Sequence, residues 1–154
     1  MKTLRLIGMA LFAIVMSVNF VACDDDDEDF DIGQLEGTWG LVQAEGFYYV
    51  NGQKDSYNET YDPANPNDDS EKAVIKKVGG NKYTLTDYEF YMGQWHEGET
   101  ETFTLEGNKV IPAQADPEIH YIKVVTANEK HLVIESGGKD EDGDFYDKLS
   151  FIRM

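Results

Sequence analysis

The chain has 154 residues, and 13 Lys and Arg stand against 30 Asp and Glu, which gives a formal net charge of −17. A surface this acidic repels nucleic acid and anionic lipid headgroups, so nucleic-acid binding is excluded. The chain contains one cysteine, and we therefore expect a domain that folds without an internal disulfide.

The first 22 residues have the three parts of a secretory signal peptide. Lys2 and Arg5 give a positive start, residues 6–15 are apolar apart from one glycine, and small Ala22 precedes Cys23. The apolar run is about half as long as a bilayer-spanning helix needs. We therefore expect residues 1–22 to be cleaved rather than to remain as a membrane anchor.

Phe20-Val21-Ala22-Cys23 resembles the lipobox of bacterial lipoproteins, with Phe20 where leucine is usual. The resemblance implies that Cys23 becomes the first residue, carrying a diacylglycerol on its thiol and an acyl chain on its amine. Each buried acyl methylene contributes about 0.8 kcal/mol, so three chains would anchor the protein stably in a membrane. The alternative is an ordinary secreted protein that is cleaved elsewhere and keeps a free cysteine.

Seven carboxylates follow within residues 24–31, and no cation accompanies them. Such a run repels itself and cannot bury apolar surface, so residues 23–32 are predicted to form a solvated tether. An acidic stretch directly after the cysteine resembles the signal that routes some Gram-negative lipoproteins to the cell surface of the outer membrane. The alternative is a spacer without a routing role. A calcium loop is disfavoured, because no glycine turn folds these carboxylates around an ion.

From residue 33 to residue 154, short β-rich runs alternate with turn signals, and no segment keeps a helical apolar period over three turns. Hairpin turns are predicted at Asn51-Gly52, Gly79-Gly80, Gly107-Asn108 and 127–130. Polar loops are predicted at 57–70 and 136–143. About eight strands joined as successive hairpins predict an all-β domain, either a closed antiparallel up-and-down barrel or a sandwich.

One predicted strand has a break in its alternation. Tyr83 and Leu85 are apolar at odd positions, whereas Tyr88, Phe90 and Met92 are apolar at even positions. A single inserted residue would keep all five side chains on one face, so we predict a β-bulge near Thr86-Asp87.

Gly37-Thr38-Trp39 opens the first predicted strand and resembles the G-x-W signature of lipocalins. The resemblance implies a lipocalin-like barrel over residues 33–154, with one closed and one open end. It also implies that Arg153, on the last strand, covers Trp39 at the closed end, with its guanidinium within about 6 Å of the ring. The alternative is an exposed arginine near the chain terminus.

Metal and catalytic motifs are incomplete. His96 begins a zincin-like pattern that lacks its second histidine, and His120 and His131 are predicted to lie about 20 Å apart along one hairpin. The stretch 139–147 has acidic residues but not the spacing of an EF-hand. No nucleophile elbow, Cys/His pair or phosphate loop occurs. We therefore predict no enzyme, no metal site and no cofactor.

Aromatic residues are the remaining functional signal. Tyr48 and Tyr49 precede the first turn, and Tyr88, Phe90 and Trp95 cluster further along the chain. They either fill the core or line a site at the open end for a small apolar or glycan-like ligand.

Two functions fit these features. The first is a membrane-anchored, non-catalytic lipoprotein that binds such a ligand. The alternative is an interaction or inhibitor-like lipoprotein with a filled barrel, an unidentified protein partner and no small-molecule ligand. An interior pocket of several hundred Å³ would favour the first, and a packed interior with an exposed apolar patch on residues 57–70 would favour the second.

Overall fold

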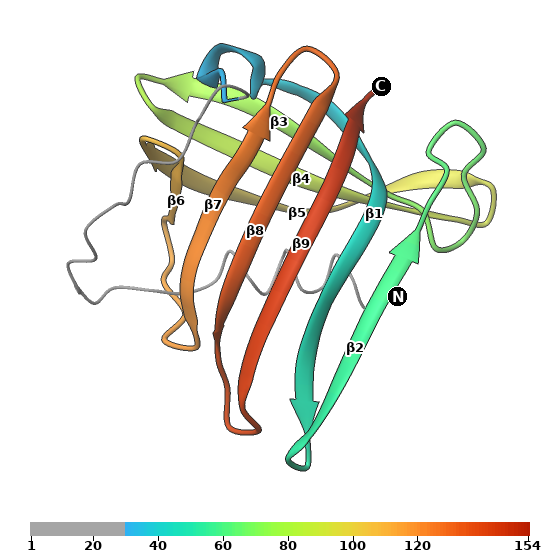
Figure 1. The fold of residues 1–154 in the computed structure, drawn as a ribbon. Helices are drawn as coiled ribbons and strands as arrows, with labels where there is room; N and C mark the ends of the chain where they lie inside the picture. Colours follow the sequence, from blue (N-terminus) through green and yellow to red (C-terminus); the bar gives the residue numbers. More distant parts are fainter. Residues whose placement is uncertain (1–29) are drawn as a thin grey trace.

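A computed structural model describes residues 30–154, which form a single antiparallel sheet that closes on itself (Figure 1). A short 3₁₀ helix precedes nine strands: η1 (Ile32–Gln34), β1 (Gly37–Val50), β2 (Gln53–Thr60), β3 (Glu71–Gly79), β4 (Lys82–Tyr91), β5 (Gln94–Glu106), β6 (Lys109–Pro112), β7 (Ile119–Ala127), β8 (His131–Lys139) and β9 (Asp144–Arg153). No helix among residues 30–154 is long and apolar enough to cross a membrane.

The barrel closes because the long strand β1 is paired along both edges. One edge pairs with β9, from Trp39–Arg153 to Phe47–Tyr146. The other pairs first with β3, over residues 37–40, and then with β2, over residues 43–50. Strands β1 and β3–β9 therefore make an eight-stranded closed barrel, and β2 is an extra strand beside it. The predicted all-β antiparallel barrel is confirmed.

The turns follow the predicted glycine signals, but two predicted loops are too long. Asn51 and Gly52 have φ angles of 52° and 75°, as a tight hairpin between twisted strands requires. The predicted loop 57–70 begins only at residue 61, because the polar run before it is an exposed strand. The predicted loop 136–143 begins only at residue 140: Gly138 lies within β8, where an added Cβ would meet the Glu118 carbonyl oxygen of the neighbouring chain segment.

Backbone hydrogen bonds to residues in or beside turns mark one end of the barrel. The Arg153 amide donates to the Lys130 carbonyl at 3.0 Å, Val124 to Asn108 at 2.8 Å, and Asp31 to Ala127 at 2.8 Å. We call this the closed end; it comprises residues 30–36, 76–82, 106–109, 127–131 and 152–154. The opposite, open end is formed by the connections at 51–52, 61–70, 92–93, 113–118 and 140–143.

The predicted register shift is present, but its consequence differs from the prediction. The β4–β5 pairing shifts between Thr86 and Tyr88, whereas the β3–β4 ladder runs without a shift from Glu71–Glu89 to Lys77–Tyr83. Because β4 itself stays regular, its alternation continues and the expectation of one shared face is wrong. Asp87 lies on the inner face, and Tyr88 lies on the outer face. The extra residue belongs to β5, at Gly98 and Glu99.

The predicted signal peptide, Cys23 and the tether up to residue 29 lie outside the described residues. The last tether residues contact the barrel. Phe30 forms a parallel bridge with Ala127 and packs against the core.

Candidate functional site

The closed end is sealed by the two residues singled out in the sequence. The guanidinium carbon of Arg153 lies 4.2 Å from the centroid of the Trp39 ring, within the predicted distance. Trp39 is fully buried, and its indole N–H donates to the Leu35 carbonyl at 2.9 Å. A Cβ at position 37 would collide with the guanidinium. The glycine of the Gly37-Thr38-Trp39 motif is therefore needed to admit the arginine.

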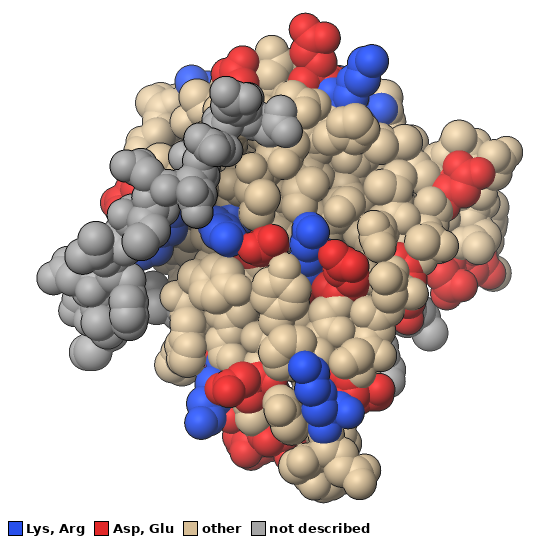
Figure 2. Space-filling view, viewed as in Figure 1, with Lys and Arg blue, Asp and Glu red and all other residues tan. Residues whose placement is uncertain are grey.

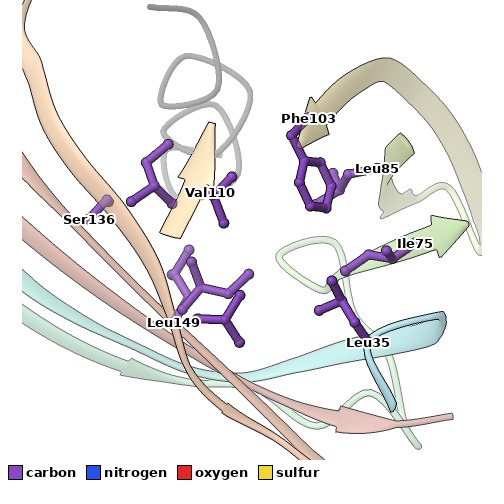
Figure 3. A pocket seen from close by; sticks show the side chains of 10 residues that line it. Leu35, Ile75, Leu85, Phe103, Val110, Ser136 and Leu149 are labelled. Atoms are coloured by element: carbon purple, nitrogen blue, oxygen red, sulfur yellow. The ribbon is translucent and has the colours of Figure 1, made fainter. Parts of the chain in front are cut away.

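The barrel interior is almost filled. A small apolar cavity of about 40 Å³ lies inside it, and Figure 3 shows side chains from the surrounding strands pointing into this space. The lining residues are Leu35, Ile75, Leu85, Phe103, Val110, Ile122, Val124, Ile134, Ser136 and Leu149. Such a volume has room for one or a few water molecules. Ligand pockets usually measure about 300–1,000 Å³, so this cavity cannot hold a ligand of ordinary size without rearrangement.

Carboxylates replace apolar side chains on the inner face toward the open end. Glu101 pairs with buried Leu85, and both its carboxylate oxygens are buried without a hydrogen-bond partner among residues 30–154. Burial, with the neighbouring charges of Glu99 and Asp87, raises the pKa of Glu101 to about 8. Burial also raises the pKa of Asp147, which accepts a hydrogen bond from the Tyr57 hydroxyl. Sequence reasoning missed these inward acids because the strand register decides which face they occupy.

Glu101 makes stability dependent on pH. Its pKa is about 8 in the folded state and 4.5 ordinarily, so the folded state holds a proton that the unfolded state releases as pH rises between these values. Stability is therefore lost over that window. We expect Glu101→Gln to raise the free energy of unfolding by about 1–2 kcal/mol at pH 9, after discounting for partial solvent exposure, and to change little at pH 4. Urea unfolding at both pH values measures this. Glu106→Gln, an exposed site on the same strand, is the control, and a gain for Glu101→Gln that is equal at both pH values would contradict the assignment.

Three of the predicted ligand-binding aromatic residues lie together, on the outside of the barrel. Tyr88, Phe90 and Trp95, here called the aromatic platform, occupy the outer face of the β4–β5 hairpin near the open end. The Phe90 and Trp95 rings are 5.2 Å apart at 71°. The Lys72 ammonium lies 5.0 Å from the Tyr88 ring and 4.5 Å from the Trp95 ring. Burial lowers the pKa of Lys72.

The other two predicted aromatic residues occupy a separate hairpin. Tyr48 lies on β1, where its hydroxyl donates to the Asp55 carboxylate at 3.2 Å. The ring of Tyr49 packs against Gly143, in the β8–β9 turn. The structure therefore does not bring Tyr48 and Tyr49 into the aromatic platform.

A polar groove of about 600 Å³ lies where β2 leaves the barrel. We call it the polar groove. Its lining residues are Glu59, Thr60, Tyr61, Asp62, Asn65, Asn67 and Asp69. The chain turns away after the Tyr61 amide donates to Val42, and Pro63 then packs over Gly40, where a Cβ would collide with it. Asp62 stabilises the turn by accepting hydrogen bonds from the Asn65 side chain and from the Ala64 amide, which lower its pKa.

The polar groove and the aromatic platform are neighbours. The Ser70 hydroxyl donates to the Asn67 side chain at 3.1 Å, and the Ser70 carbonyl accepts from the Phe90 amide at 2.9 Å. Figure 2 shows acidic side chains gathered on the side of the molecule where the β2–β3 loop and the β4–β5 hairpin project. The sequence marks 57–70 only as a polar loop, because the groove depends on how that loop packs on β1.

The three histidines make separate contacts. His96 stacks on Tyr91 with the ring centroids 3.5 Å apart, while His120 and His131 lie toward opposite ends of the β7–β8 pair. No group of three potential metal-ligating side chains occurs within residues 30–154.

Residues 35–134 match the family model described as a lipocalin-like domain. A solved structure of the siderocalin Ex-FABP, reported to function through dual ligand specificities, aligns with a TM-score of 0.50 and 11% sequence identity. The alignment covers 79% of this chain and 71% of that one. No curated protein matches the sequence. At this identity the structural likeness concerns the fold alone.

Proposed function

Because the chain belongs to the family of lipocalin-like domains, we propose that it is a non-catalytic binding protein whose ligand is a small, neutral, glycan-like molecule. The ligand occupies the polar groove and contacts the aromatic platform. We further propose that a lipid on Cys23 anchors the protein to the outer membrane and that the acidic tether routes it to the cell surface. The lipobox-like residues 20–23 and the seven carboxylates within 24–31 support this location.

We choose the polar groove as the ligand site because of its volume. The polar groove measures about 600 Å³ and the interior cavity about 40 Å³. Of these two spaces within the described residues, only the groove is within the usual range of ligand pockets, about 300–1,000 Å³. Its lining is polar, which suits a ligand with many hydroxyl groups rather than an apolar one.

The polar groups that line the groove suit a neutral ligand with many hydroxyl groups. The carboxylates of Glu59, Asp62 and Asp69 accept hydrogen bonds from hydroxyl groups, and the amides of Asn65 and Asn67 both donate and accept them. No lysine or arginine lines the groove to offset the three negative charges, so an anionic ligand is repelled. The neighbouring platform offers flat aromatic faces that can pack against the apolar face of a sugar ring.

We expect binding to depend on the Asp69 carboxylate and on the Trp95 ring. Asp69→Ala removes a charged acceptor, and Trp95→Ala removes the largest ring of the platform. A lost hydrogen bond to a charged group costs about 1.5–3 kcal/mol, so we expect about a tenfold loss of affinity or more for Asp69→Ala. Calorimetric titration with a panel of neutral oligosaccharides measures the affinity of each variant. Native mass spectrometry of protein recovered from its own cells detects a retained ligand and guides the choice of the panel.

Two controls match these variants. Asp68→Ala removes the adjacent exposed carboxylate, which does not line the groove, and Tyr48→Ala removes an aromatic ring on the other hairpin. Both should bind as the wild type does. If Asp68→Ala weakens binding as much as Asp69→Ala, the effect is one of overall charge and the groove is not the site.

The filled interior also favours the alternative function, an interaction or inhibitor-like lipoprotein. An exposed apolar patch on residues 57–70 would favour this alternative further, but the exposed large hydrophobic residues of the described chain lie elsewhere: Ile32, Val50, Val78, Tyr91, Met92, Tyr121 and Met154. Recovery of the protein with a protein partner and without any small molecule would support this alternative.

A further inference from the structure

The chain enters the folded domain at the closed end. Phe30 bridges to Ala127, and the Asp31 amide donates to the Ala127 carbonyl at 2.8 Å. The next turn is fastened by Arg153, which donates to the carbonyls of Gln34 and Glu36 at 2.5 and 2.9 Å. An anchor on the N-terminal side of the chain is therefore attached to this end of the barrel.

Cys23 is seven residues before Phe30. Seven residues span at most about 25 Å, even when fully extended. A lipid on Cys23 thus keeps the closed end within about 25 Å of the bilayer surface, while the strands place the open end about another 25 Å along the barrel.

The charges of the molecule are strongly segregated between its two ends. The closed end carries six basic and four acidic side chains, a net charge of +2, and residues 24–29 ahead of it in the predicted tether add six carboxylates. The other described residues carry five basic and twenty acidic side chains, a net charge of −15. The basic residues of the closed end are Lys76, Lys77, Lys82, Lys109, Lys130 and Arg153. The five lysines are exposed, and none forms an ion pair with another residue of the 30–154 region.

Three apolar side chains of the closed end are also exposed. Val78 is 61% exposed, Met154 52% and Ile32 41%. Exposed apolar side chains beside lysines suit the boundary between headgroups and acyl chains. Electrostatic screening limits the range of a charge to about 8 Å at physiological salt, so a headgroup senses the charges nearest to it rather than the total charge of the protein. In the proposed orientation these are the closed-end lysines and the carboxylates of the predicted tether, while the acidic open end is out of range.

We propose that the closed end is the membrane-facing surface of the protein, with its lysines against anionic headgroups, and that the open end points away from the bilayer. The inference rests on the proposed anchor at Cys23. Its consequence is that the polar groove and the aromatic platform meet molecules arriving from the aqueous side. Each lysine near an anionic surface contributes about 1 kcal/mol, while the acidic open end is repelled.

The orientation can be measured on the lipidated full chain in vesicles of phosphatidylcholine with and without phosphatidylglycerol. A single added cysteine carries a fluorescent donor, either His131→Cys at the closed end or Gln53→Cys at the open end; both sites are exposed. The lipid carries the acceptor. We expect the efficiency of energy transfer from position 131 to be at least about twice that from position 53, because the two labels differ in height above the bilayer by about 25 Å. Equal transfer, or higher transfer from position 53, would overturn the proposal.

A second comparison isolates the contribution of charge. The double variant Lys76→Glu/Lys77→Glu should reduce the difference between the two labels only in vesicles that contain phosphatidylglycerol. Lys139→Glu, near the open end, is the control and should leave the difference unchanged. If the double variant has no effect, the headgroup contact is wrong.

The anchor and the orientation fail in distinguishable ways. Protein that does not float with vesicles contradicts the lipid on Cys23. A hexahistidine sequence in place of residues 1–23, bound to nickel-chelating lipid, then repeats the energy-transfer measurement at the same attachment point. Higher transfer from position 131 in this form supports the membrane-facing end without the native lipid, and the reverse overturns it.

Discussion

An Arg153→Ala variant is expected to unfold with a free energy about 2–3 kcal/mol lower than that of the wild type. The side chain stacks on Trp39 at 4.2 Å and donates to the carbonyls of Gln34, Glu36 and Glu129. A cation–π contact contributes about 0.5–2 kcal/mol, and hydrogen bonds from a charged donor add to it, although water replaces part of them here. For a domain of this size, the melting temperature should fall by roughly 10 °C.

The conservative variant separates charge from shape. Arg153→Lys keeps the positive charge but loses the planar stacking and the forked donors, so it should lose at least half of the same stability. Lys148→Ala is the control, because its partner Glu45 is 3.3 Å away on the exposed outer face, and such ion pairs contribute about 0–1 kcal/mol. Calorimetric melting of the three variants tests the contact. Arg153→Ala melting within about 2 °C of Lys148→Ala would show that Arg153 does not hold the closed end.

The sequence predicted structure well where a few residue types are restricted by their own local chemistry. The Asn51-Gly52 turn needs two residues that tolerate positive φ angles, and both are present side by side. Gly37 and Trp39 form a motif whose third member, Arg153, is the only arginine after residue 22. Because local chemistry restricts these positions strongly, both the hairpin and the stacked pair could be predicted.

Prediction failed where the answer depended on a partner strand. The apolar residues of β4 indicated a bulge in β4, but the extra residue lies in β5, where Gly98 leaves room for the Asp87 carboxylate. The side chains after residue 86 therefore lie on the face opposite to the predicted one. The same reversal placed the aromatic platform outside the barrel and Asp87 inside it.

The candidate ligand site was only partly predictable for a related reason. Tyr88, Phe90 and Trp95 lie together as their closeness in sequence indicates, because cross-strand neighbours in a hairpin are close in sequence. The polar groove depends instead on Pro63 packing over Gly40, two residues whose proximity follows from the path of the loop after β2. Composition alone shows that the loop is polar, and it does not show that the loop encloses a groove.

A Cys23→Ala variant is expected to leave the membrane fraction completely. If Cys23 carries the anchor, the substitution removes every acyl chain, and each buried methylene contributes about 0.8 kcal/mol. The domain itself supplies only a few favourable charges at the closed end against a net charge of −15 elsewhere in the described chain, so nothing of comparable strength remains. Fractionation of cells and incorporation of labelled palmitate measure the two consequences.

The matched control alters the same motif without removing the thiol. Phe20→Leu restores the residue that is usual in a lipobox, so this variant should remain in the membrane fraction and incorporate palmitate at least as well as the wild type. Wild-type protein that is soluble and unlabelled would show that Cys23 is a free cysteine of a secreted domain. The closed end would then have no lipid to keep it near a bilayer, and its lysines would have to bind anionic headgroups against the repulsion of the acidic open end.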